Sequence, residues 1–138
     1  MRPRLLLLAL LLAAAIAGCG QAPSSAGDFK GTKKDVADTI EQLQTSAQNR
    51  KPEDICSEVL SRALVEKLKS SGHDCVDEME NIVSDADDFK LDVTAVTVTG
   101  TTATARVKAR RDGHANALTT FALAREDGKW RLTDLGAS

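Results

Sequence analysis

Cysteine has the most definite chemistry of any residue type in this chain, which contains Cys19, Cys56 and Cys75. Cys56 and Cys75 are 19 positions apart, so they lack the C-x-x-C spacing of a redox or zinc site. His73 lies close to Cys75, but this sparse set without H-x₃-H spacing makes a poor metal site. Three interpretations of the pair remain open: a structural disulfide, free thiols in the core, or a ligand or redox role.

The residues before Cys19 indicate where the protein resides. Arg2 and Arg4 precede an apolar, acid-free run that ends in small residues, which is the order of a secretory signal peptide. The run is shorter than the about 20 apolar residues that a membrane-spanning helix needs. Its end, Ile16-Ala17-Gly18-Cys19, resembles the lipobox of bacterial lipoproteins. That resemblance implies cleavage before Cys19 and attachment of diacylglycerol, with acyl chains such as palmitate, to its thiol.

We therefore expect residues 1–18 to be a lipoprotein signal peptide. The mature protein would be anchored to the cell membrane through lipidated Cys19, on the extracytoplasmic side. Disulfides persist in such compartments, which favours pairing of Cys56 with Cys75.

Length and charge limit what the remainder can be. Removing residues 1–18 from the 138 leaves 120, enough for one domain, and takes the net charge from −2 to −4. An acidic chain of this kind lacks the electrostatic footprint of a nucleic-acid-binding protein. Residues 19–31 are small and polar and are expected to form a flexible tether, which leaves residues 32–138 as a single domain.

Helical periodicity dominates the first half of that domain. Residues 32–35 have the form of a capping box, and apolar positions then recur at helical spacing to about Asn49. Pro52 restarts a helix, with a jog expected at Ser61 and a stop at Gly72. Asp74 is expected to cap a third helix that ends before Asp85.

From Phe89 the period changes to two. The apolar phase reverses near Thr94 and Ala95, which predicts a β-bulge, and further strands follow over about 101–110, 118–125 and 129–135. Asp112-Gly113 is a strong hairpin signal. The expected fold is α+β, with three N-terminal helices packed on a curved four-stranded antiparallel sheet.

Two hairpin sequences carry a resemblance to a known family. The segments Val96-Thr97-Val98-Thr99-Gly100-Thr101-Thr102-Ala103-Thr104-Ala105-Arg106-Val107 and Glu126-Asp127-Gly128-Lys129-Trp130-Arg131-Leu132 look like those of small actinobacterial lipoproteins with a domain similar to the nuclear-transport-factor-2-like superfamily. The resemblance implies a cone-shaped cavity between sheet and helices. Phe121, Trp130 and Leu132 are candidates to line it, or else belong simply to the core.

Enzymatic relatives in that superfamily, such as ketosteroid isomerases and polyketide cyclases, use acids, histidines or tyrosines inside the cavity. This sequence has no tyrosine, and the remaining candidates for catalytic groups are Asp92, Asp134 and His114. We therefore favour a non-enzymatic envelope lipoprotein that binds an unknown protein or a small apolar ligand. A cone-cavity enzyme of the isomerase or cyclase type is the alternative.

Charge is divided unevenly along the chain. Residues 32–92 carry a net charge of −7 and residues 101–138 a net charge of +3. Arg106, Lys108 and Arg110 alternate along one strand, so they share one face. This face is either an ordinary solvated face of the sheet or a surface that meets anionic headgroups, near which a membrane tether would hold it. No cofactor or metal is implied, because the acidic run 85–88 lacks the glycine and glutamate of a calcium loop.

Overall fold

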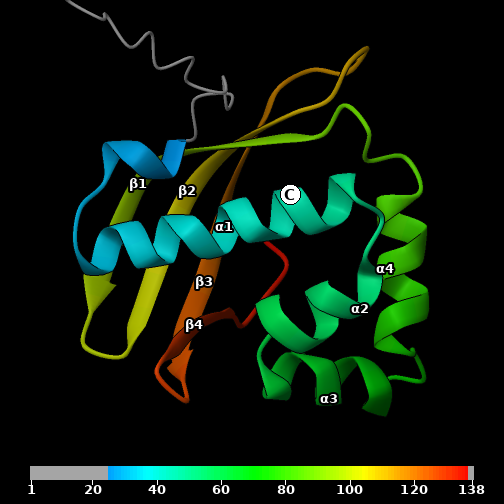
Figure 1. Cartoon of the computed structure of the whole chain (residues 1–138). Helices are drawn as coiled ribbons and strands as arrows, with labels where there is room; N and C mark the ends of the chain where they lie inside the picture. The colour runs from blue at the N-terminus through cyan, green and yellow to red at the C-terminus, as the bar shows by residue number, and fades with distance from the viewer. Residues whose placement is uncertain (1–24, 137–138) are drawn as a thin grey trace, which may run out of the picture.

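The computed structural model describes residues 25–136, which form two layers: an antiparallel sheet and helices that cover one of its faces (Figure 1). The helices precede the strands in the chain, which confirms the expected α+β class. In chain order the elements are η1 (Ser25–Asp28), α1 (Thr32–Gln48), α2 (Pro52–Asp54), η2 (Ile55–Val59), α3 (Arg62–Ser70), α4 (Cys75–Val83), β1 (Lys90–Thr99), β2 (Thr102–Arg110), β3 (Ala117–Glu126) and β4 (Lys129–Leu132).

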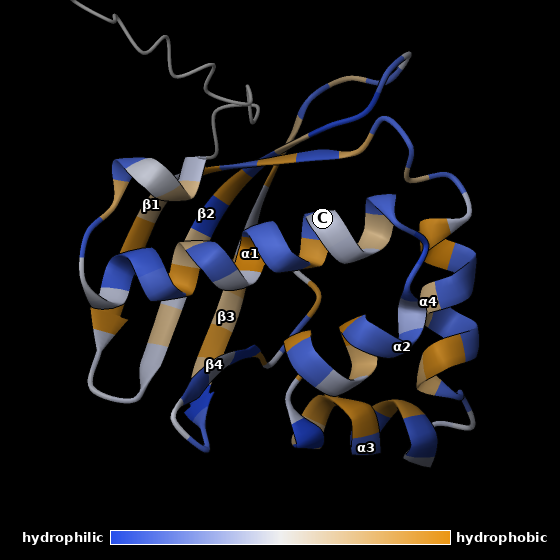
Figure 2. Cartoon of the chain, in the orientation of Figure 1, coloured by the Kyte–Doolittle hydropathy of each residue, from blue (hydrophilic) through white to orange (hydrophobic). Residues whose placement is uncertain are grey.

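Helix α1 lies across the sheet, with its apolar positions turned toward the strands (Figure 2). The start of this helix differs from the prediction. Gly31, with a φ of 58°, is the N-cap, Thr32 is already helical, and no side chain caps the helix. The predicted capping box was therefore wrong, because the left-handed glycine turns the chain into the helix one residue before the threonine.

The second expected helix is divided into two parts. It begins at Pro52, continues as the π-helical turn η2 and is interrupted at Leu60, where ψ is 147°. Leu60 there forms a β-bridge with Leu132, and the Ser61 N–H donates to the Leu132 carbonyl at 2.8 Å. The irregularity expected at Ser61 is thus a complete break in the helix. The backbone at Leu60 and Ser61 pairs with Leu132 of strand β4 and does not continue the helical hydrogen bonds.

Helix α4 begins as the sequence predicted. The Asp74 carboxylate accepts from the N–H groups of Val76 and Asp77 at 2.9 and 3.3 Å. The helix ends at Val83, before Asp85.

The strands form a meander in the order β1-β2-β3-β4. The register between β1 and β2 shifts at Thr94, which confirms the predicted bulge. Strand β4 ends at Leu132 and not at residue 135. Beyond it the Asp134 carboxylate accepts from the Gly136 N–H at 2.9 Å, so the chain turns away from the strand direction.

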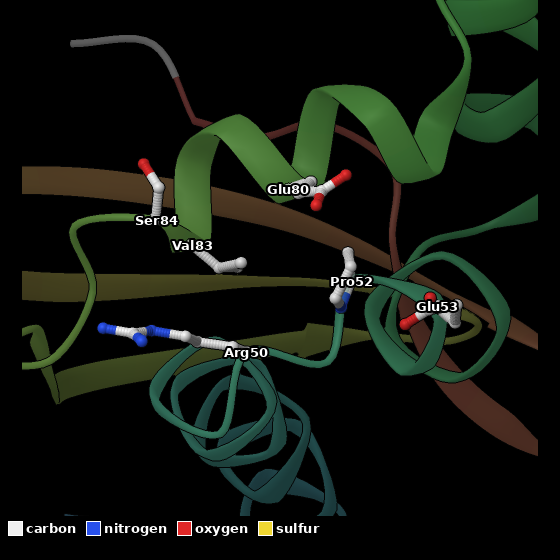
Figure 3. A pocket seen from close by; sticks show the side chains of 6 residues that line it. All are labelled: Arg50, Pro52, Glu53, Glu80, Val83 and Ser84. Carbon is white, nitrogen blue, oxygen red and sulfur yellow. The ribbon is translucent and has the colours of Figure 1, made fainter.

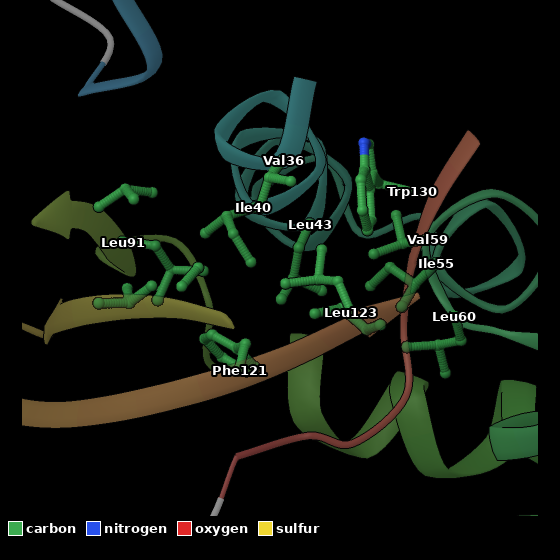
Figure 4. Packing of buried hydrophobic residues seen from close by; sticks show 14 of the residues in the cluster. Val36, Ile40, Leu43, Ile55, Val59, Leu60, Leu91, Phe121, Leu123 and Trp130 are labelled. Carbon is green, nitrogen blue, oxygen red and sulfur yellow. The ribbon is translucent and has the colours of Figure 1, made fainter. Parts of the chain in front are cut away.

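The core lies between the inner face of the sheet and the helices (Figure 4). Hydrophobic side chains from α1, η2 and the strands meet there and bury almost all of their surface. The largest fully buried members are Ile40, Ile55, Met79, Leu123, Leu132, Val36, Val59 and Val107.

The segment before α1 also packs on this core. Ala26 in η1 is 1% exposed, and the Ser25 hydroxyl accepts from the Val93 N–H at 3.1 Å. Residues 25–28 belong to the segment 19–31 expected to be flexible, and they are instead held against β1. The signal peptide 1–18 and Cys19 lie outside the described residues. None of the helices within residues 25–136 has the length and apolar character needed to cross a bilayer.

Candidate functional site

The two downstream cysteines are joined by a disulfide. Cys56 in η2 and Cys75 at the start of α4 are bonded across a Cα–Cα distance of 6.1 Å. This supports the favoured interpretation of the pair. The bond closes a loop that contains α3, so it fastens that helix to the rest of the helical layer.

The three candidate cavity residues are all buried. Phe121 is 6%, Trp130 5% and Leu132 0% exposed, and all three belong to the core cluster. Figure 4 shows Phe121 near Leu123 in the core, whereas Trp130 stands beside α1 with its ring nitrogen directed away from the labelled leucines. Trp130 therefore lies at the boundary between the core and the surface next to α1.

A surface groove begins at Trp130. Four of its lining residues, Asp35, Asp38, Thr39 and Gln42, lie at i, i+3, i+4 and i+7 of α1 and so form one stripe along the helix. The opposite wall comes from Glu58 in η2 and from residues 128–130 at the β3–β4 turn. The groove encloses about 340 Å³.

The three carboxylates of the groove differ in how far neighbouring cations neutralise them. Lys34 donates to both carboxylate oxygens of Asp38 at 2.8 and 2.7 Å, and this hydrogen bond raises the pKa of Lys34 above its usual 10.5. Glu58 pairs with Lys129 at 3.6 Å and more distantly with Arg131 at 3.9 Å. Among the described residues Asp35 makes no such ion pair, so it is the groove carboxylate least neutralised by a neighbour.

The floor of the groove contains a buried hydrogen-bond donor. Trp130 Nε1 has less than 1 Å² exposed and no acceptor among the described residues. The Thr39 hydroxyl donates toward the backbone carbonyls of Asp35 and Trp130, at 3.1 and 3.4 Å, and makes no hydrogen bond with Nε1. Sequence reasoning predicted burial of Trp130 but missed this donor, since its surroundings come from segments distant in the chain.

A second hollow, of about 420 Å³, opens where the end of α1 meets α2 and α4 (Figure 3). Its lining mixes charged and apolar groups, and Arg50 at its edge pairs with Asp87 at 2.7 Å. Within the described chain, no group of three or more His, Cys, Asp or Glu side chains is placed to hold a metal ion.

The predicted basic residues lie together on the outer face of the sheet. Arg106, Lys108 and Arg110 alternate along β2 with the buried Ala105 and Val107, so they point away from the core. Arg106 and Arg110 are exposed and Lys108 is half-buried. Arg110 pairs with Asp92 on β1 at 2.6 Å, which partly neutralises one end of the row.

The residues considered for catalysis do not meet in a pocket. Asp92 is half-buried on the outer face, and Asp134 is exposed and occupied with backbone N–H groups of Ala122 and Gly136. His114 is exposed in the β2–β3 loop, and His73 pairs with Glu78 at the start of α4. The geometry brings none of them into the core.

Comparison with known proteins gives a distant structural likeness. No protein-family model and no curated protein matches the chain. The fold is similar to that of a putative NTF2-like transpeptidase from Campylobacter jejuni, with a TM-score of 0.46 and 17% sequence identity over 70% of this chain and 96% of that one. At this similarity the comparison carries no argument about activity, and the α+β assignment rests on the elements themselves.

Proposed function

We propose that this chain is a lipid-anchored envelope lipoprotein on the extracytoplasmic side of a membrane, and that its domain acts by binding and not by catalysis. The observation that carries the proposal is the seating of Ser25 against β1. Only six Cα–Cα steps separate Cys19 from Ser25, so a lipid at Cys19 keeps the domain within about 20 Å of its attachment point.

This short connection favours one orientation of the domain. Ser25 shares a surface hollow with Lys90, Asp92 and Arg110, so the first described residue lies beside the basic row of β2. A cationic side chain near an anionic lipid surface contributes about 1 kcal/mol. Arg106 and Lys108 have no ion pair to another described residue and supply most of this attraction, whereas Arg110 shares its charge with Asp92.

Anchoring is tested by feeding producing cells an alkyne analogue of palmitate and comparing the full chain with its Cys19→Ser variant. The full chain should incorporate the label and sediment with membranes, and the variant should do neither. Equal labelling of both would refute attachment at Cys19.

Orientation is tested separately with residues 20–138 and vesicles of phosphatidylglycerol and phosphatidylcholine. The double variant Arg106→Gln/Lys108→Gln should bind about 30-fold more weakly at low salt, from the loss of two contributions of about 1 kcal/mol. Lys67→Gln/Lys69→Gln is the matched control, since these exposed lysines lie on α3, away from η1 (Figure 1). Equal losses in the two double variants, or binding that ignores salt, would refute the orientation.

A further inference from the structure

The Trp130 indole nitrogen is one of two buried side-chain nitrogens without a hydrogen-bond partner among the described residues, the other being Arg131 Nε. An indole N–H can only donate, and a buried donor without an acceptor costs about 1–3 kcal/mol. Trp130 is 5% exposed, its Nε1 has no partner among the described residues, and the ring lines the groove beside α1. Figure 4 shows that the nitrogen is on the side of the ring away from the core. The groove therefore presents a donor for which an acceptor has to come from outside the described chain.

The surrounding charges restrict the kind of acceptor. Asp35, Asp38 and Glu58 line the same groove and outnumber its one lining cation, Lys129, so a carboxylate or phosphate oxygen would approach the indole against a net negative charge. A neutral carbonyl oxygen meets no such repulsion. Because Asp38 and Glu58 already have lysine partners, Asp35 is the carboxylate available to a cation.

We propose that this groove binds a peptide-like molecule with a free primary amine next to a neutral carbonyl group. The ammonium group lies at Asp35, and the carbonyl oxygen accepts the Trp130 Nε1–H hydrogen bond. Thr39 and Gln42 continue the stripe of α1 and offer polar contacts to a short backbone. The volume of about 340 Å³ is at the lower end of the range of roughly 300–1,000 Å³ for ligand pockets, which suits a short peptide of small residues.

Entry of the carbonyl requires a small movement at the rim, since Nε1 itself is covered in the empty groove. Glu58 and Lys129 are 47% and 67% exposed, and their ion pair of 3.6 Å links the two segments that form the wall opposite α1. An exposed pair of this kind is worth about 1 kcal/mol or less, so its opening costs little. This inference rests on the binding role proposed above and is independent of the lipid anchor.

The test uses the single tryptophan of the chain, whose indole N–H gives one cross-peak in a ¹⁵N-correlated spectrum of the protein. The probe is trialanine amide, which has a free amine and no carboxylate. Its N-acetylated form and acetate are the controls. Trialanine amide should move the indole proton downfield in a saturable manner and slow its exchange with solvent, and the acetylated form should bind about fivefold more weakly. Acetate should leave the cross-peak in place.

Two variants separate the two contacts. Asp35→Asn should remove the preference for trialanine amide over its N-acetylated form. The shift of the indole cross-peak at saturation should persist in this variant. Trp130→Phe keeps an aromatic ring without the donor and should weaken binding of trialanine amide by about fivefold in calorimetry. No movement of the indole cross-peak, equal shifts with the acetylated probe, or an unchanged preference in Asp35→Asn would overturn the proposal. None of these results depends on palmitate labelling or vesicle binding, so failure here is distinguishable from failure of the anchoring proposal.

Discussion

Removal of the Cys56–Cys75 disulfide in the double variant Cys56→Ala/Cys75→Ala should lower the free energy of unfolding by a calculable amount. The bond closes a loop over a sequence separation of 19. In the chain-entropy model, a loop of this length restricts the unfolded chain by about 3 kcal/mol at 25 °C. For a domain of this size, that loss corresponds to a midpoint lower by about 10–15 °C.

The assay is urea unfolding followed by Trp130 fluorescence and by circular dichroism. Trp130 lies in the core and the disulfide in the helical layer, so coincident transitions would show that the domain unfolds as one unit. Reduced wild-type protein is the matched control, because it keeps both sulfur atoms and lacks only the cross-link. It should lose nearly as much stability as the double variant.

A loss below about 1 kcal/mol in both samples would refute the loop-closure reasoning. A loss confined to the alanine variant would instead assign the effect to packing around Cys75, which is 6% exposed. Hydrogen exchange gives a local check. Amide protection in α3, the helix inside the closed loop, should fall more than protection in α1.

Further predictions concern single positions. Ser61→Ala should lower the free energy of unfolding by about 1 kcal/mol, because the buried Ser61 hydroxyl accepts from the Leu64 N–H at 3.1 Å and caps α3. Urea unfolding measures this loss, and an unchanged midpoint would contradict the prediction. Gly136→Ala should lower the melting temperature more than Gly113→Ala. Both glycines have a φ of 77°, but only at Gly136 would a Cβ meet another atom within 3 Å; equal losses would contradict this. The pKa of Lys34 is raised, so its ion pair stabilises the fold fully below about pH 10.5 and less as pH rises through the folded-state pKa. Stability of Lys34→Gln and wild type should therefore converge at high pH, and a constant difference would contradict the role of the charge.

Local patterns predicted the regular elements of this fold well. Helical and alternating periodicity located the helices and strands, the phase reversal located the bulge at Thr94, and Asp74 caps α4 as its position suggested. Each of these features depends on residues close together in the chain. The start of α1 was misjudged because Gly31 and Thr32 compete for one turn, and the positive φ of glycine decides it.

The candidate site was less accessible to sequence reasoning. Trp130 was expected among core or cavity residues, whereas the proposed peptide site depends on its N–H, which has no acceptor in the described part of the chain, and on a groove shared with α1 and η2. Asp35 was expected only as the acid of the capping box predicted at residues 32–35. The two come together only because α1 lies across the sheet next to β4, a contact between residues more than 90 positions apart.

The sequence by itself determined the α+β class and the basic row on β2, and it predicts export and lipid attachment at Cys19. Each follows from composition or from spacing over a few residues. Only the tertiary structure decided that α3 starts after a break at Leu60, that η1 packs on β1, and that Trp130 lines a groove together with three carboxylates. These features depend on hydrogen bonds and packing between distant segments, and their geometry is set when the helical layer closes on the sheet.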